Sequence, residues 1–77
     1  MNKQEILQKV IELAFSINLD DDITEFTNIE NDLDWDDLDK IEFIIDLENE
    51  FNIHIVDDMF INLNTIENFV DYIINRV

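Results

Sequence analysis

The stretch LDWDDLDKIEFIIDLENEF (residues 33–51) decides the fold that this sequence predicts. It begins with alternating acidic residues and continues with apolar residues at the spacing of an amphipathic helix. Asp36 and Asp39 have the three-residue separation of a capping box, in which each side chain bonds the backbone N–H of the other residue. The stretch therefore predicts a helix over 37–50. Its expected buried stripe consists of Ile41, Ile44, Ile45, Leu47 and Phe51, with Phe43 at the flank.

Further helices are predicted on either side of this one. Over 3–15, the apolar residues at positions 7, 10, 11 and 14 follow one face of a helix. Near the C-terminus, Asn64 and Glu67 are expected to cap a last helix. The apolar face of that helix consists of Ile66, Phe69, Val70, Ile73 and Ile74. A short helix over 59–63 is expected to precede it.

The connections between these helices also carry apolar residues. Between 16 and 36 the helical period is lost, but apolar residues recur among the acidic ones, which predicts a long first loop held on the core. Residues 51–56 alternate between apolar and polar. Because a lone strand has no partner, an extended connector is expected there, with Ile53 and Ile55 in the core. Together the elements predict an all-α, four-helix bundle with three main helices, a short third helix and a long first loop.

The composition fits one small domain over residues 1–77. This length lies near the lower limit for a core without covalent staples, and the chain has no cysteine to form one. A hydrophobic content of 47% supplies that core and argues against a disordered acidic tail. Because glycine and proline are both absent, turns are expected to use Asn and Asp, which tolerate left-handed backbone.

The net charge of −16 is the strongest compositional signal. It disfavours nucleic acid and anionic membranes as partners and favours a protein with a basic surface. Acidity for solubility alone is the simpler alternative. No apolar run approaches the roughly 20 residues of a membrane span, and the N-terminus lacks the layout of a signal peptide. A monomeric, cytoplasmic protein is therefore expected.

The acidic residues before the 37–50 helix do not form a convincing metal-binding motif. Asp32, Asp34 and Asp36 have the 1-3-5 spacing of an EF-hand loop. However, Asp37 stands where that loop needs glycine, and Phe43 where it needs a bidentate Glu. No specific metal site is expected, although crowded carboxylates should bind divalent cations loosely.

Trp35, His54 and Ser16 are the remaining candidates for chemistry. Trp35 is expected to fold over the entrance of the 37–50 helix and cover apolar surface, with contact to a partner as the alternative. His54 is expected to be an exposed connector residue, and Ser16, the only serine, to have a role at a helix end. No nucleophile is paired with a base, so no enzyme is expected.

The residues described so far resemble the acyl carrier protein family. The family signature, Asp-Ser-Leu, opens its second helix, and Asp36-Asp37-Leu38 stands at that place here. The runs IEF (41–43), LENEF (47–51) and IVD (55–57) and residues 64–73 are similar to the rest of the family pattern. The resemblance covers essentially the whole chain. It implies a carrier-type helical bundle of fatty acid biosynthesis.

Three positions depart from the family pattern. Asp34 stands where the family often has glycine, and Val56 where it often has proline. Asp37 occupies the position of the serine that carries the family's phosphopantetheine arm. A carboxylate is not the hydroxyl nucleophile that accepts this arm, and residues 30–40 contain no other serine or threonine. No cofactor is therefore expected on this chain.

The resemblance also implies a docking surface, because enzymes that serve the family present basic patches to its second helix. The matching positions are Asp36, Leu38, Asp39, Glu42, Glu48 and Asp57, with Ile45 as an apolar contact. The leading hypothesis is an acidic docking module that binds a basic patch on a partner enzyme and carries no arm. One alternative is a genuine acyl carrier of fatty acid or polyketide type biosynthesis whose serine was deliberately replaced. Another is an acidic decoy that inhibits a nucleic-acid-binding protein.

Overall fold

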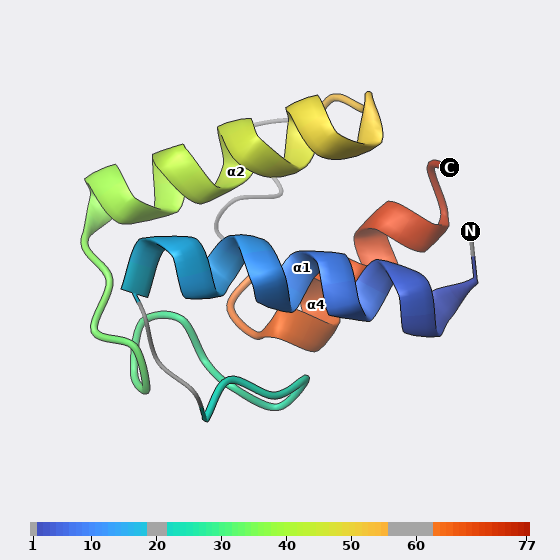
Figure 1. The fold of residues 1–77 in the computed structure, drawn as a ribbon. Coiled ribbons are helices and arrows are strands. Elements are labelled where there is room, and N and C mark those ends of the chain that lie inside the picture. Colours follow the sequence, from blue (N-terminus) through green and yellow to red (C-terminus); the bar gives the residue numbers. More distant parts are fainter. Residues whose placement is uncertain (1, 19–21, 56–62) are drawn as a thin grey trace.

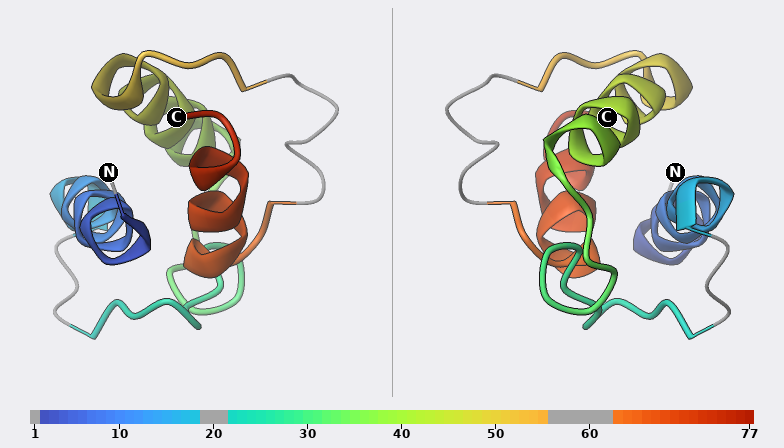
Figure 2. Two further views of the ribbon diagram at one scale, coloured as in Figure 1. Left: turned by 90° about the vertical axis from the view of Figure 1, so that its right-hand side faces the viewer. Right: turned by 90° about the vertical axis from the view of Figure 1, so that its left-hand side faces the viewer.

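The computed structural model describes residues 2–18, 22–55 and 63–77, and within them the chain forms three helices. These are α1 (Lys3–Asn18), α2 (Asp37–Phe51) and α4 (Ile66–Ile74) (Figure 1). Seen end-on, α2 lies above α1 and α4, and α1 contacts both of the other helices (Figure 2). The predicted all-α fold is confirmed. The expected short helix falls on residues outside the described ranges, except for Leu63, which is buried and not helical.

Helix α1 runs three residues further than the predicted 3–15. Asn2 precedes its first residue, Lys3, and the Asn2 side-chain oxygen accepts a hydrogen bond of 2.9 Å from the backbone N–H of Glu5. Ile6, Val10 and Ala14, one turn apart, are fully buried. The Ser16 hydroxyl donates to the carbonyl of Leu13 at 2.8 Å. The predicted helix-end role of this serine is confirmed.

Helix α2 begins with the predicted capping box. Asp36 has extended backbone, its side chain accepts from the N–H of Asp39 at 3.0 Å, and the Asp39 side chain accepts from the N–H of Asp36 at 3.4 Å. The helix ends at Asn52, whose left-handed backbone (φ 53°) stops the helical run. Both ends are therefore set by Asp and Asn, as expected for a chain without glycine.

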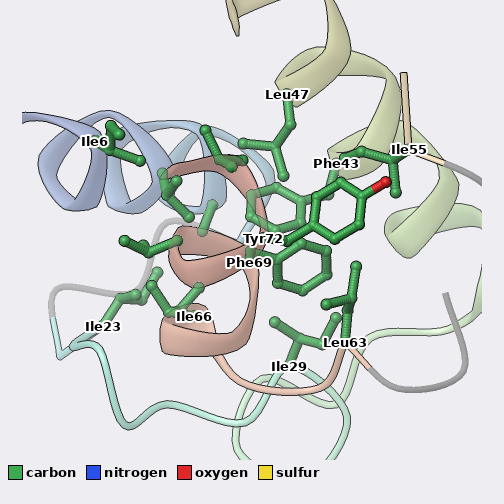
Figure 3. Close-up of a cluster of buried hydrophobic side chains, with 14 of the residues drawn as sticks. Ile6, Ile23, Ile29, Phe43, Leu47, Ile55, Leu63, Ile66, Phe69 and Tyr72 are labelled. Atoms are coloured by element: carbon green, nitrogen blue, oxygen red, sulfur yellow. The ribbon is translucent and has the colours of Figure 1, made fainter. Parts of the chain in front are cut away.

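The buried face of α2 differs from the predicted one. Phe43, Leu47 and Phe51 form the buried row, whereas Ile41 and Ile45 are about half exposed. Phe43 is the centre of this contact because its ring packs edge-on against Trp35 and against Phe69 of α4, each at 5.0 Å between centroids. Figure 3 shows Phe43 facing Phe69 and Tyr72 across the core. The assignment of Ile41 and Ile45 to the buried stripe was wrong.

Helix α4 begins one residue later than expected and uses a different cap. Thr65 has extended backbone and accepts from the N–H of Asn68, and the Asn68 side chain accepts from the N–H of Thr65 at 3.2 Å. The predicted Asn64–Glu67 cap was therefore wrong. Asn68 satisfies the N–H of Asn64 as well, which leaves Glu67 no capping role. The predicted apolar face of α4 is confirmed as buried, with Ile74 only partly so.

The long loop before α2 is fixed to the core, as predicted. Ile23, Ile29 and Leu33 are buried. The backbone N–H groups of Ile66 and Glu67, at the start of α4, donate to carbonyls of the loop. Asn28 and Thr65 form an isolated antiparallel bridge. Trp35, at the end of the loop, is 6% exposed and covers the entrance of α2, so its predicted packing role is confirmed. Among the described residues, none accepts a hydrogen bond from its indole N–H.

The connector after α2 is extended and leads back to the core. Ile55 is buried and Ile53 partly buried, as predicted. The N–H of Ile55 donates to the Glu48 carboxylate at 2.8 Å, and the Tyr72 hydroxyl donates to the carbonyl of His54 at 3.3 Å. The side chain of His54 is exposed, as expected.

Candidate functional site

The solvent-facing side of α2 carries an apolar row that the core does not use. Leu38 is 75% exposed, Ile41 48% and Ile45 49%. Their spacing of three and four residues places them along one strip of the helix. The strip begins at the helix N-terminus and runs for two turns. A row of this kind on an otherwise strongly acidic surface is typical of a contact region for another protein.

Acidic side chains accompany this row. Asp37, in the first turn, and Glu42 are both exposed, and no described residue forms an ion pair or hydrogen bond with either carboxylate. Asp36 and Asp39 contribute charge at the same end, but their carboxylates also hold the capping box. The helix N-terminus favours this negative charge because its backbone N–H groups carry partial positive charge.

Two of the expected docking acids are not part of this exposed group. The Glu48 side chain is 24% exposed and faces the connector. There it accepts from the N–H of Ile55 and lies 3.2 Å from Nδ1 of His54. Asp57 lies outside the described residues. The structure thus brings together Asp36, Asp37, Leu38, Asp39, Glu42 and Ile45, and it gives Glu48 an internal role.

Ile41 belongs to this surface, although its spacing predicted it only for the buried stripe of the helix. The same apolar spacing that predicted a buried stripe also joins Ile41 to Leu38 and Ile45. The signal was therefore present, but periodicity alone does not say which of two apolar rows faces the core.

Asp32, Asp34 and Asp36, which have the EF-hand spacing, have structural roles in the loop and at the start of α2. The carboxylate of Asp32 accepts from the N–H of Asn28 at 2.8 Å, Asp34 takes the left-handed backbone (φ 56°), and Asp36 caps α2. Over the described ranges, no three His, Cys, Asp or Glu side chains gather as a metal-binding group. None of the helices in those ranges is long and apolar enough to cross a membrane.

The fold and this surface define a class: a small acidic helical module with an exposed apolar row along one of its helices. Comparison with known proteins narrows the class. No family model matches the chain. It is 44% identical over 75 residues to an acyl carrier protein of Lactobacillus acidophilus, covering 95% of this chain and 94% of that protein. It is 36% identical over 78 residues to one of Rubrobacter xylanophilus, covering 99% and 96%.

A solved structure agrees with these relatives. The acyl carrier protein from Enterococcus faecalis, studied for its high thermal stability, superimposes with a TM-score of 0.84 at 33% identity and full coverage of both chains. The chain belongs to the acyl carrier protein family. Members of this family are carriers that bear phosphopantetheine and work with biosynthetic enzymes, and they are not themselves enzymes.

Proposed function

We propose that this chain is an acyl-carrier-type docking module that binds a basic-surfaced partner enzyme through α2 and carries no phosphopantetheine arm itself. The observation that supports this best is the exposed row Leu38, Ile41 and Ile45 with acidic side chains beside it. The partner would be an enzyme that recognises acyl carrier proteins, because the chain belongs to that family.

Physical chemistry gives the two parts of this surface different roles. Covering the apolar row removes hydrocarbon from water, which favours a complex by about 25 cal/mol for each Å² of apolar surface buried, before the entropy lost on association is subtracted. The carboxylates of Asp37 and Glu42 attract Lys and Arg of the partner from a distance, so they raise the association rate. Salt screens such exposed charges, so we expect association to slow as ionic strength rises.

The absence of an arm rests on Asp37. It stands where the family motif has its modified serine, and it offers a carboxylate in place of a hydroxyl. The only serine of the chain, Ser16, lies in the last turn of α1 and donates its hydroxyl to the helix backbone. A fixed negative charge at position 37 instead adds to the acidic end of α2.

One experiment tests the loss of the arm. The protein and its Asp37→Ser variant are each incubated with coenzyme A and a broad-specificity phosphopantetheinyl transferase, and their intact masses are measured. We expect only the variant to gain the arm. A gain by the unaltered chain would show that it is a carrier after all. Failure of both would mean that α2 is no longer recognised as a carrier surface.

The Asp37→Ser variant also reports on docking. Adding Leu38→Ser or Glu42→Lys to it should slow arm transfer about tenfold each, because buried contacts and complementary charges at an interface are worth about 1–2 kcal/mol. Val77→Ser, which also removes an exposed apolar side chain but lies at the C-terminus, is the matched control and should have no effect. Equal rates for all three would argue against docking through α2.

The genuine carrier is the second candidate function. The match to carrier proteins over nearly the full length of both chains favours it. If Asp37→Ser restores arm transfer at the rate of an ordinary carrier, the surface is that of a carrier and position 37 alone separates the two functions.

A further inference from the structure

A second exposed apolar feature lies away from α2. Phe26 is 72% exposed, although the residues on both sides of its turn are buried, Ile23 before it and Thr27 directly after it. Segment 22–32 lies on the side of α1 and α4 opposite to α2 in both views (Figures 1 and 2). The prediction that the apolar residues between 16 and 36 hold this loop on the core was wrong for Phe26.

The turn that carries Phe26 is held rigidly. Inside the turn, the Thr27 hydroxyl accepts from the N–H of Thr24 at 2.9 Å, and the Thr24 hydroxyl accepts from the N–H of Phe26 at 3.2 Å. Its backbone also bonds the first turn of α4. The N–H of Ile66 donates to the Thr27 carbonyl at 3.0 Å, and that of Glu67 to the Glu25 carbonyl at 2.8 Å.

This anchoring has an energetic consequence for binding. A side chain on a loose loop loses conformational freedom when a partner orders it, which weakens the complex. The backbone of Phe26 is already fixed, so binding has to order only its two side-chain torsions. Aromatic residues, Phe among them, are enriched at protein interfaces relative to the rest of the surface.

The charges around Phe26 indicate what covers it. Glu25 directly precedes Phe26, and the backbone of Glu67 is hydrogen-bonded to that of Glu25. Two acidic residues therefore belong to the turn or contact it. A second copy of this chain would bring another net charge of −16 to the contact, which opposes self-association. Basic side chains around an apolar centre would satisfy both the ring and the carboxylates.

We propose that the Phe26 turn is a second docking surface, independent of α2, which binds a basic amphipathic segment of a partner protein. The apolar side chains of that segment enclose the ring of Phe26, and its Lys or Arg side chains meet Glu25 and Glu67. Because the turn and α2 lie on opposite sides of α1 and α4, both surfaces can be occupied at once.

The test uses a synthetic probe of this chemistry. It is a peptide of about four helical turns with Leu on one face and Lys on the other, and the control peptide keeps the Lys residues but has Ser in place of Leu. Backbone amide NMR of the full chain is recorded during titration. We expect the Leu/Lys peptide to shift the signals of 22–28 and 65–68, and the Ser/Lys peptide to leave them unchanged.

Variants then assign the contact. Phe26→Ser should weaken binding at the turn about tenfold or more, as for loss of an aromatic anchor, while any peptide-induced shifts in α2 persist. Glu25→Gln with Glu67→Gln should weaken it less and flatten its salt dependence. Val77→Ser, which removes an exposed apolar side chain at the C-terminus, is the control and should not affect binding at the turn. Unchanged melting temperatures will show that these variants are folded.

Three results would overturn the proposal. The first is failure of the peptide to bind through Phe26, seen either as shifts in α2 signals alone or as binding at the turn that survives Phe26→Ser. The second is a sedimentation mass that rises with protein concentration and is returned to the monomer value by Phe26→Ser, which would make a second copy the occupant. The third is shifts at the turn with zwitterionic phosphatidylcholine vesicles and none with the peptide, which would make a lipid surface the occupant. Docking through α2 is tested separately, by arm transfer to the Asp37→Ser variants, so these results do not decide it.

Discussion

Asp34 has a backbone conformation that suits glycine better than aspartate. Its φ of 56° lies in the left-handed region, where glycine has no penalty and other residues lose about 1–2 kcal/mol. Asp and Asn are the least unfavourable of these others. The expectation that Asp and Asn would replace glycine in turns is confirmed here and at Asn52, which ends α2 with a φ of 53°.

A substitution series at Asp34 tests this demand. Asp34→Gly should raise the free energy of unfolding by about 0.5–1 kcal/mol, since relief of the left-handed penalty outweighs the greater freedom of glycine in the unfolded chain. Asp34→Ala should lower it by about 1 kcal/mol. Asp34→Asn removes the charge and keeps the tolerance, so it is the control. Urea unfolding followed by circular dichroism gives the free energy of unfolding of all three variants. A glycine variant that is less stable than the alanine variant would refute this explanation.

Trp35 shows what could and could not be predicted for a single residue. Its position before an amphipathic helix predicted a ring folded over the helix entrance, because a large apolar surface gains most from burial. That the buried indole N–H finds no hydrogen-bond acceptor in the described part of the chain could not be predicted. Whether a carbonyl reaches that N–H depends on how the loop and helices meet in three dimensions, which the local sequence does not contain.

At the scale of the element, α2 was predictable in its existence and start but not in its orientation. The capping box of Asp36 and Asp39 needs only residues three apart, so the sequence contains all of it. The buried face depends on what packs against it. Two apolar rows run along this helix, and contacts with Trp35 and Phe69 select the row that contains Phe43.

Two truncating substitutions on α2 compare how much each apolar row contributes to the free energy of unfolding. Phe43→Ala should lower the free energy of unfolding by about 3–5 kcal/mol, because it opens a cavity between Trp35 and Phe69. Ile45→Ala, from the half-exposed row, should change it by less than about 1 kcal/mol. Chemical denaturation gives both values. Similar losses for the two variants would mean that Ile45 contributes to the core as the sequence first predicted.

The role of Glu48, on the same helix, could not be predicted from helical spacing. The resemblance to carriers grouped it with the docking acids, since it stands at a matching position. In the structure its carboxylate accepts from the N–H of Ile55, seven residues away, and thereby fixes the connector to α2. A helical pattern relates residues three and four apart, so it does not reveal a bond to the segment beyond the helix end.

The molecule as a whole has few basic side chains to offset its negative charge. Twenty Asp and Glu residues face four Lys and Arg residues. Lys3 pairs with Asp71 between α1 and α4, and Lys40 with Glu30 between α2 and the long loop. Arg76 lies over the ring of Tyr72, 4.5 Å from its centroid. Mutual repulsion among the remaining carboxylates destabilises the compact state relative to the expanded chain.

Divalent cations should therefore stabilise the fold without a dedicated site. Millimolar magnesium chloride should raise the melting temperature by several degrees, since about 1 kcal/mol shifts the midpoint of a domain of this size by roughly 4–8 °C. Sodium chloride at the same ionic strength should act in the same direction but less, because a divalent ion concentrates more strongly near crowded carboxylates. Circular dichroism melts with each salt make the comparison. A melting point that stays constant across millimolar magnesium would show that repulsion does not limit the stability of this fold.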